Sequence, residues 1–308
     1  MNLSDYDNKK IKVFLHDGST LEGIGVHGPR EYYECEFGVD AECVQICDYL
    51  IREDEIERIE LLDVQPSIRN TEEDIAMLFS VRRSFSEHLK RWEDNELPDK
   101  YDHNCFAYSA QPSREEFERA LQYQKERGDK FIKLEGDFPL EDDFGLSPAV
   151  TLTMQFTGST GNKQLAGGTE GWTVNDEIEI KKPAYKDIIE IELKHFGPVY
   201  GEDFTVRNAD RLFEHLDYRG AYAGEKLVGA YYFYSSDGYT CVDGLIVDED
   251  WRHRYIATTL LKHAVEEAAG NAVFLHADED GTPKEMYKKL GFREEDRLYE
   301  YLLTGEDA

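Results

Sequence analysis

Long apolar segments and basic residues are both scarce in this 308-residue sequence. No apolar run approaches the roughly 20 residues that cross a bilayer as a helix, and the start, MNLSDYDNKK, lacks the apolar core of a signal peptide. Lys and Arg number 35 against 65 Asp and Glu, which gives a formal net charge of -30. Such a charge repels nucleic acid and anionic membranes and favours cationic partners, although it also serves solubility alone. We therefore expect no nucleic-acid and no membrane partner.

Cysteines are few, odd in number and scattered: the five are Cys35, Cys43, Cys47, Cys105 and Cys241. No CxxC pair occurs among them. Without an export signal, this pattern predicts reduced thiols in the cytoplasm. Cys43 and Cys47, together with Cys35, would offer zinc three thiolates, but no histidine pattern completes a four-ligand site. We therefore expect no metal.

The stretch from Cys241 to Ala268, CVDGLIVDEDWRHRYIATTLLKHAVEEA, predicts a buried strand, a tight turn and an amphipathic helix. Leu245 to Val247 belong to a short apolar run of strand length, which Asp248 to Asp250 end. From Thr258 onward, apolar residues recur at helical spacing. A strand that leads directly into a helix leaves the first helical N–H groups without partners, and such groups bind phosphate.

The six residues at this join, Arg252-His253-Arg254-Tyr255-Ile256-Ala257, resemble the [Q/R]-x-x-G-x-[G/A] turn of the GNAT acetyltransferases. The first and last positions match, whereas Tyr255 stands where the family has glycine, which should hinder close approach of the backbone to a ligand. Two further segments resemble the family in the right order. Gly220 to Tyr234 is similar to its central hairpin, and Phe274 to Phe292 to its later strand, short helix and closing Y-x-k-l-G-F.

The resemblance implies that the chain binds acetyl-CoA as acyl donor. In the family, the strand before the turn offers main-chain groups to the pantetheine arm, and the turn holds the pyrophosphate. Asp280 stands seven residues before the family's tyrosine, where the family has asparagine, and it adds a negative charge. The residues implied to bind the coenzyme are Leu245, Ile246, Val247, Arg252, His253, Arg254, Tyr255, Ile256, Ala257, Thr258 and Asp280.

Acyl transfer to an amine requires that the ammonium loses a proton and that the leaving thiolate gains one. The resemblance implies Tyr287 as the acid, and the alternative is a core tyrosine with a satisfied hydroxyl. Asp243 is the candidate base, and the alternative is a solvent-facing or ion-paired aspartate. Its spacing of two residues from Leu245 predicts that both side chains share one strand face. The remaining histidines of this region are read as surface or core residues: His253, His263 and His276.

The length allows two or three domains, and we predict three: residues 1–64, 65–171 and 172–308. The expected fold class is α/β (α+β). Its C-terminal part is a GNAT fold with a mixed, mostly antiparallel central sheet. A degenerate GNAT-like α/β unit and a small N-terminal β-barrel precede it. For residues 65–171, an unrelated α/β insert is the open alternative.

Local signals support this division. In the first domain, Asp17-Gly18 predicts a hairpin, and segments 31–39, 44–50 and 56–62 read as further strands, an order that resembles an Sm-like or SH3-like barrel. In the second, Thr71 opens a predicted helix whose buried side extends to Leu89. A capping box, Ser113 to Glu116, opens another helix that Gly128 ends. The glycine-rich segment 158–171 is a linker or a mobile loop.

Two functions of different class remain. The first is an acetyl-CoA-dependent N-acetyltransferase that transfers acetyl directly to a cationic amine: a polyamine, an aminoglycoside-like amine or a protein amine. The second is a non-catalytic acyl-CoA sensor or interaction scaffold that keeps the GNAT fold. A third role, RNA binding through the barrel, is disfavoured by the acidity of the chain. A homodimer is left open, and the expected location is the cytoplasm.

Overall fold

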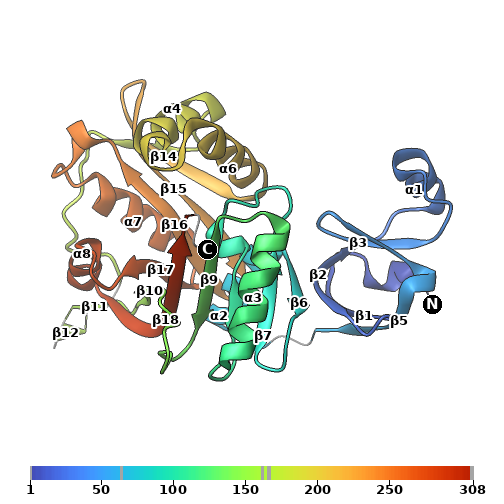
Figure 1. Cartoon of the computed structure of the whole chain (residues 1–308). Coiled ribbons are helices and arrows are strands. Elements are labelled where there is room, and N and C mark those ends of the chain that lie inside the picture. The colour runs from blue at the N-terminus through green and yellow to red at the C-terminus, as the bar shows by residue number, and fades with distance from the viewer. Residues whose placement is uncertain (1, 63–64, 161–162, 165–167, 306–308) are drawn as a thin grey trace. The chain divides into compact units, whose positions relative to one another are not determined.

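The computed structural model describes residues 2–62, 65–160, 163–164 and 168–305 (Figure 1). The chain forms two compact units. The N-terminal unit comprises Met1–Gln65, Glu73–Ala149 and Tyr299–Ala308, and the C-terminal unit comprises Pro66–Glu72 and Val150–Leu298.

The three-domain division stays a prediction. Its first boundary, at Val64, lies outside the described residues, as do residues 161–162 and 165–167 of the predicted linker. The described part of that segment contains the two-residue strands β11 (Ser159–Thr160) and β12 (Lys163–Gln164).

Five short strands open the N-terminal unit: β1 (Lys9–Leu15), β2 (Thr20–Val26), β3 (Cys43–Ile46), β4 (Tyr49–Arg52) and β5 (Ile56–Leu61). β1 pairs antiparallel with β2 and β5, β2 with β3, and β3 with β4. The Asp17-Gly18 hairpin is confirmed, and Gly18 has a φ of 85°, which favours glycine. Closure of these strands into an Sm-like or SH3-like barrel stays a prediction.

The predicted strand over 31–39 is wrong, because Arg30–Phe37 form the helix α1. Tyr33 and Phe37 are four residues apart, and their ring centroids lie 6.3 Å apart, a contact that helical spacing allows. Gly38 ends the helix in the left-handed conformation with a φ of 68°. Aromatic residues in the segment suggested a strand, whereas this helical contact and the C-terminal glycine favour the helix.

The rest of the N-terminal unit contains β6 (Val81–Ser84), β7 (Leu89–Glu93), β8 (Phe106–Tyr108), α3 (Arg114–Arg127) and β9 (Phe131–Gly136). The capping box is confirmed, since the Glu116 N–H donates to Ser113 Oγ at 3.2 Å and Gly128 ends α3. The predicted helix as far as Leu89 is wrong: α2 (Ile68–Met77) is shorter, and the β6–β7 hairpin follows. β6 also pairs with β2, a distant partner that local periodicity does not reveal.

In the C-terminal unit, the sheet has the order β13 (Glu179–Lys181), β14 (Asp217–Ala223), β15 (Lys226–Ser236), β16 (Tyr239–Val247), β17 (Ala272–Asp278) and β10 (Ser147–Phe156). Only β16 and β17 are parallel, and the other neighbours are antiparallel. The last described strand is β18 (Phe292–Thr304), whose residues from Tyr299 onward belong to the N-terminal unit. The helices are α4 (Tyr185–His195), α5 (Gly197–Tyr200), α6 (Glu202–His215), α7 (Ile256–Glu267) and α8 (Pro283–Lys289). The predicted mixed, mostly antiparallel sheet is confirmed.

Helix α7 crosses from β16 to β17 on one face of this sheet, and α4 and α6 cover the other face (Figure 1). The main core lies on the α7 side and contains Leu260, Leu261 and Tyr231. Both leucines are fully buried, and burying one leucine side chain stabilises the fold by about 1.5–3 kcal/mol. This core fixes the start of α7 against the sheet.

β16 and β17 are paired only at the start of each strand and then separate. Their paired residues run only from Tyr239 with Ala272 to Cys241 with Phe274, although the strands continue to Val247 and Asp278. At the same place β16 bulges. Ala230 pairs with Ile246 and Tyr232 with Asp243, so Gly244 and Leu245 lie together opposite one residue of β15.

Gly244 holds the bulge with a φ of 61°, and a Cβ built on it would lie 2.3 Å from the Tyr232 ring. We expect Gly244→Ala to lower the free energy of unfolding by about 1–3 kcal/mol more than Gly238→Ala. Gly238 is the matched control, because its φ is 87° but a Cβ there meets nothing within 4 Å. Urea denaturation of both variants measures the difference, and equal losses would contradict the steric role of the bulge.

Candidate active site

The turn after β16 is anchored by Asp248. Its carboxylate accepts hydrogen bonds from Lys194 Nζ at 3.0 Å and from the Asp250 N–H at 3.0 Å, and it lies 3.2 Å from Lys226 Nζ. Burial opposes ionisation, but these hydrogen bonds outweigh it and lower the pKa of Asp248 to about 2. Asp248, which follows the apolar strand segment in the sequence, therefore also fixes the geometry of the turn. The 3₁₀ helix Glu249–Trp251 follows it.

The start of α7 has the features that an anion site requires. Tyr255 is the N-cap residue, makes no side-chain capping hydrogen bond, and has the left-handed φ of 61°. No acidic residue occupies the first turn of the helix. The first N–H groups of α7 therefore carry the positive end of the helix dipole without a side-chain cap.

The side chains of residues 252–255, around this start, are exposed. Tyr255 is 55% exposed, the Arg254 guanidinium lies over the Trp251 ring at 4.8 Å, and Arg252 lies 3.7 Å from Glu249. Asn175 Nδ2 donates to the Arg254 carbonyl at 3.1 Å, which ties the turn to the preceding segment. Asp280 is exposed in the loop before α8. Coenzyme contacts of residues 245–247, of residues 252–258 and of Asp280 stay a prediction.

Tyr287 lies on α8 in the main core and is only 7% exposed. Burial, with Asp243 as a weaker contributor, raises the pKa of Tyr287 to about 12. The phenol is therefore protonated throughout the neutral range. Asp243 is exposed and accepts hydrogen bonds from the Gly244 N–H at 2.7 Å and the Tyr232 hydroxyl at 3.2 Å. The catalytic roles of Tyr287 and Asp243 stay predictions.

The prediction that Asp243 and Leu245 share one strand face is wrong. Leu245 packs against the main core, as Val242 does, whereas Asp243 lines a hollow with Glu192 of α4. The bulge at Gly244 is the reason, because one extra residue reverses the alternation of a strand. Asp243 consequently points to the α4–α6 side of the sheet.

The structure brings together a polar cluster that sequence reasoning missed. His276 Nε2 lies 2.7 Å from Glu72 Oε1, and the same ring is hydrogen-bonded to the Cys241 sulfur. Burial raises the pKa of Cys241 to about 11, so its thiol stays neutral at neutral pH. Glu72 lies 204 residues before His276 in the chain, and no local signal links the two.

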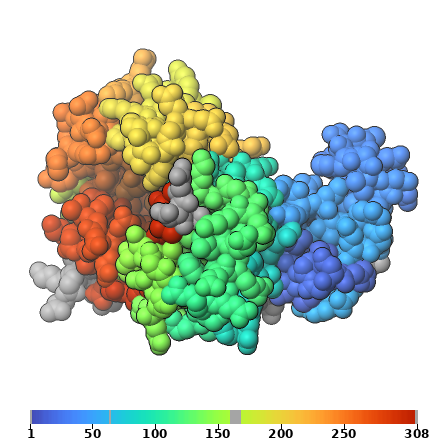
Figure 2. Space-filling view, viewed as in Figure 1, coloured from blue at the N-terminus to red at the C-terminus, as the bar shows by residue number. Residues whose placement is uncertain are grey.

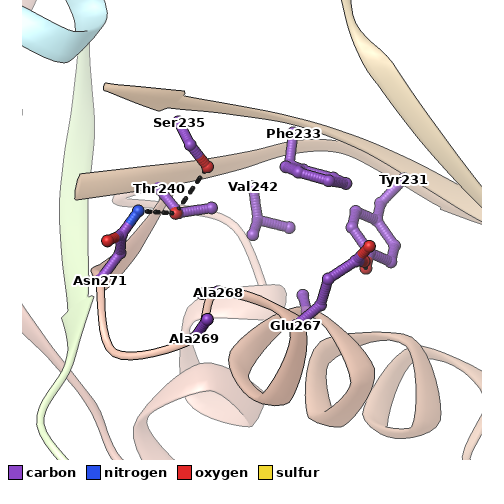
Figure 3. A pocket seen from close by; sticks show the side chains of 10 residues that line it. Tyr231, Phe233, Ser235, Thr240, Val242, Glu267, Ala268, Ala269 and Asn271 are labelled. Atoms are coloured by element: carbon purple, nitrogen blue, oxygen red, sulfur yellow. Dashed lines mark hydrogen bonds between the residues drawn. The ribbon is translucent and has the colours of Figure 1, made fainter. Parts of the chain in front are cut away.

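A second hollow, of about 280 Å³, lies at the other end of α7 and contains none of the predicted site residues (Figure 3). Ser235 and Thr240 are hydrogen-bonded at 2.9 Å, and Asn271 Nδ2 donates to Thr240 Oγ1 at 3.1 Å. Glu267 is ion-paired with Arg219. Because these polar groups already bind one another, we do not place the reaction there.

Among the described residues, no three His, Cys, Asp or Glu side chains are grouped to hold a metal ion. Within the same residues, every helix is too short or too polar to cross a membrane.

The parallel β16–α7–β17 crossover, the separation of its strands and the uncapped helix start belong to a mixed α/β fold. Residues 200–294 match the family described as acetyltransferase (GNAT) domain. The C-terminal part of this chain therefore contains a GNAT acetyltransferase domain, as the sequence predicted. No curated protein sequence matches the chain.

Two solved structures share the fold. A conserved protein of unknown function from Staphylococcus epidermidis is 16% identical with a TM-score of 0.60, and the match covers 72% of this chain and 93% of that one. A GCN5-related N-acetyltransferase from Kribbella flavida is 13% identical with a TM-score of 0.52, over 76% of this chain and 93% of that one. Both matches cover more than residues 200–294, so the similarity of fold extends beyond the family match.

The left-handed N-cap at Tyr255 can be tested by stability. We expect Tyr255→Gly to be more stable than Tyr255→Ala by about 0.5–1 kcal/mol, because only alanine has a Cβ that opposes a positive φ. Thermal or urea unfolding measures the difference. The control is the same pair of substitutions at Glu190, within α4, where the order should reverse because glycine weakens a helix. An alanine variant as stable as the glycine variant at Tyr255 would argue against the left-handed cap.

The His276–Glu72 pair predicts a pH-dependent stability. Burial lowers the pKa of His276, but the hydrogen bonds to Cys241 and Glu72 outweigh it and raise that pKa well above its ordinary value. A raised folded-state pKa stabilises the fold fully below about pH 6.5, and the contribution is lost as the pH rises through the raised pKa. Glu72→Gln should therefore lower the free energy of unfolding by roughly 1 kcal/mol at about pH 6, and by less at higher pH.

Urea denaturation of the wild type and the variant across this pH range measures the effect. His276→Asn should weaken the pH dependence of the free energy of unfolding in the same way as Glu72→Gln, because it removes the other partner of the pair. A cost of Glu72→Gln that does not change with pH would show that the pair is not a charged one.

Proposed function

We propose that the protein is an N-acetyltransferase that uses acetyl-CoA as donor and transfers acetyl directly to a cationic amine. The observation that carries this proposal is the uncapped start of α7, directly after the parting strand β16, within a GNAT domain. Its N–H groups, with Arg252 and Arg254 nearby, fit a diphosphate in charge and geometry. We also propose that it acts in the cytoplasm, since its five cysteines are free thiols, and that nucleic acid is not a substrate, since the net charge is -30.

Bound acetyl-CoA supplies the thioester, whose C–S bond breaks as the amine nitrogen forms a C–N bond to the acetyl carbon. Asp243 accepts the proton that the ammonium loses, directly or through water, because its carboxylate faces the α4–α6 side. Tyr287 donates a hydrogen bond to the sulfur as negative charge develops there. A phenol with a pKa of about 12 is a weaker acid than a thiol with a pKa of about 8.5. Its contribution is therefore to stabilise the leaving group rather than to protonate it before departure. The second proton, which the nitrogen loses as the amide forms, ends on the departed coenzyme thiolate.

Calorimetry with coenzyme A and thiol release with a panel of amines test the proposal together. We expect measurable heat on titration with coenzyme A, and thiol release with at least one amine. Binding without turnover on any amine would favour the second function, an acyl-CoA sensor or scaffold, for which the exposed Tyr255 at the family's glycine position is the supporting observation. No heat with coenzyme A would overturn both readings.

Tyr287→Phe should lower turnover on the order of 10²-fold and leave coenzyme A affinity nearly unchanged, because only the hydroxyl contacts the leaving group. Steady-state kinetics and calorimetry measure the two quantities. Tyr231→Phe is the matched control. Tyr231 is buried in the same core, but its hydroxyl is hydrogen-bonded to His263 at 3.0 Å, so its loss should not change turnover. Full activity of Tyr287→Phe would remove Tyr287 from the mechanism.

A further inference from the structure

The hollow that Asp243 lines has a second feature, an aromatic wall. The hollow measures about 230 Å³ and lies between α4, α5 and α6 and the bulged part of β16. Parts of these three helices form the surface that is coloured yellow in Figure 2. Three rings line the hollow, Phe196, Tyr200 and Phe204, at intervals of four residues.

The three rings form a continuous row. The ring centroids of Phe196 and Tyr200 lie 6.2 Å apart, and those of Tyr200 and Phe204 lie 5.8 Å apart. Tyr200 is 57% exposed, although a tyrosine buries much apolar surface when a partner covers it. The faces of such rings attract a cation through their quadrupole and an apolar group through burial. The aromatic wall therefore fits a ligand that has both a cationic group and an apolar group.

The other side of the hollow is acidic. Glu192, which is only 7% exposed, and Asp243 both line it, and none of its ten lining residues is Lys, Arg or His. Tyr218 and Tyr232 lie beside the two carboxylates with their ring centroids 5.2 Å apart. Burial, then Glu192 and Asp243, raises the pKa of Tyr218, so the phenol stays neutral. Glu192 and Asp243 are thus the two acidic side chains of the lining, and carboxylates at this place favour a cation.

We propose that this hollow is the acceptor site and that its ligand is a small monoamine with a compact apolar or aromatic body. The ammonium lies near Glu192 and Asp243, and the body packs on Phe196, Tyr200 and Phe204. This inference rests on the proposed function, because it identifies the amine as the acceptor. It narrows the earlier choice: the two carboxylates lie on one side of the hollow, and a polyamine or an aminoglycoside has no compact apolar body to cover the three rings.

Direct binding of amines, measured by calorimetry without and with coenzyme A, tests the hollow separately from the transfer reaction. The probes are 2-phenylethylamine, spermidine, kanamycin and a lysine-containing tripeptide. We expect 2-phenylethylamine to bind roughly tenfold or more tightly than the other three, because only it satisfies both sides of the hollow. Tighter binding of spermidine, kanamycin or the tripeptide, or no binding of 2-phenylethylamine in either condition, would overturn the proposal.

Variants assign the binding to this hollow. Tyr200→Ala should weaken 2-phenylethylamine roughly threefold to thirtyfold, and Tyr200→Phe should restore the affinity, because it keeps the ring. Glu192→Gln should weaken it roughly tenfold or more, whereas Glu190→Gln, at an exposed position of the same helix, should not. Unchanged affinity in both Tyr200→Ala and Glu192→Gln would place the amine elsewhere. If coenzyme A fails to bind while these amine results hold, the transferase proposal fails and the amine site remains.

Discussion

The parting of β16 from β17 is the constraint on which the rest of the C-terminal unit depends. The two strands pair only as far as Cys241, and β16 then bulges at Gly244 before it reaches the turn. A fully paired parallel strand would use its N–H and C=O groups in the sheet. Because these strands separate, residues 243–247 of β16 take no part in the β16–β17 ladder.

The turn after β16 carries positive charge, whereas the chain as a whole is strongly negative. In a protein with a net charge of -30, Arg252, Arg254 and the uncapped start of α7 concentrate positive potential at one place. Asp248, directly before them, does not cancel this potential, because Lys194 and Lys226 neutralise its carboxylate. The proposed diphosphate site is therefore the place where the charge of the chain is locally reversed.

The two faces of the C-terminal sheet have different roles. The α7 side holds the main core, with Tyr231, Val242 and Tyr287 among its members. The α4–α6 side carries Asp243 and the aromatic hollow. The bulge at Gly244 explains this division, since it directs Leu245 into the core and leaves Asp243 on the opposite face of the sheet. In the function proposed above, the donor and the acceptor would reach one reaction centre from different directions.

The sequence by itself determined the elements whose causes are local: the Asp17-Gly18 hairpin, the capped helix α3, and the strand–turn–helix from Cys241 to Ala268. Neighbouring residues set these through turn chemistry, caps and periodicity, so a linear pattern contains them. Tertiary pairing decided the rest. β6 is a strand because it pairs with β2, which is distant in the sequence. Asp243 faces the hollow because β16 bulges against β15. His276 contacts Glu72, which lies 204 residues earlier in the chain. Contacts of that kind depend on the folded register, which no short segment of sequence specifies.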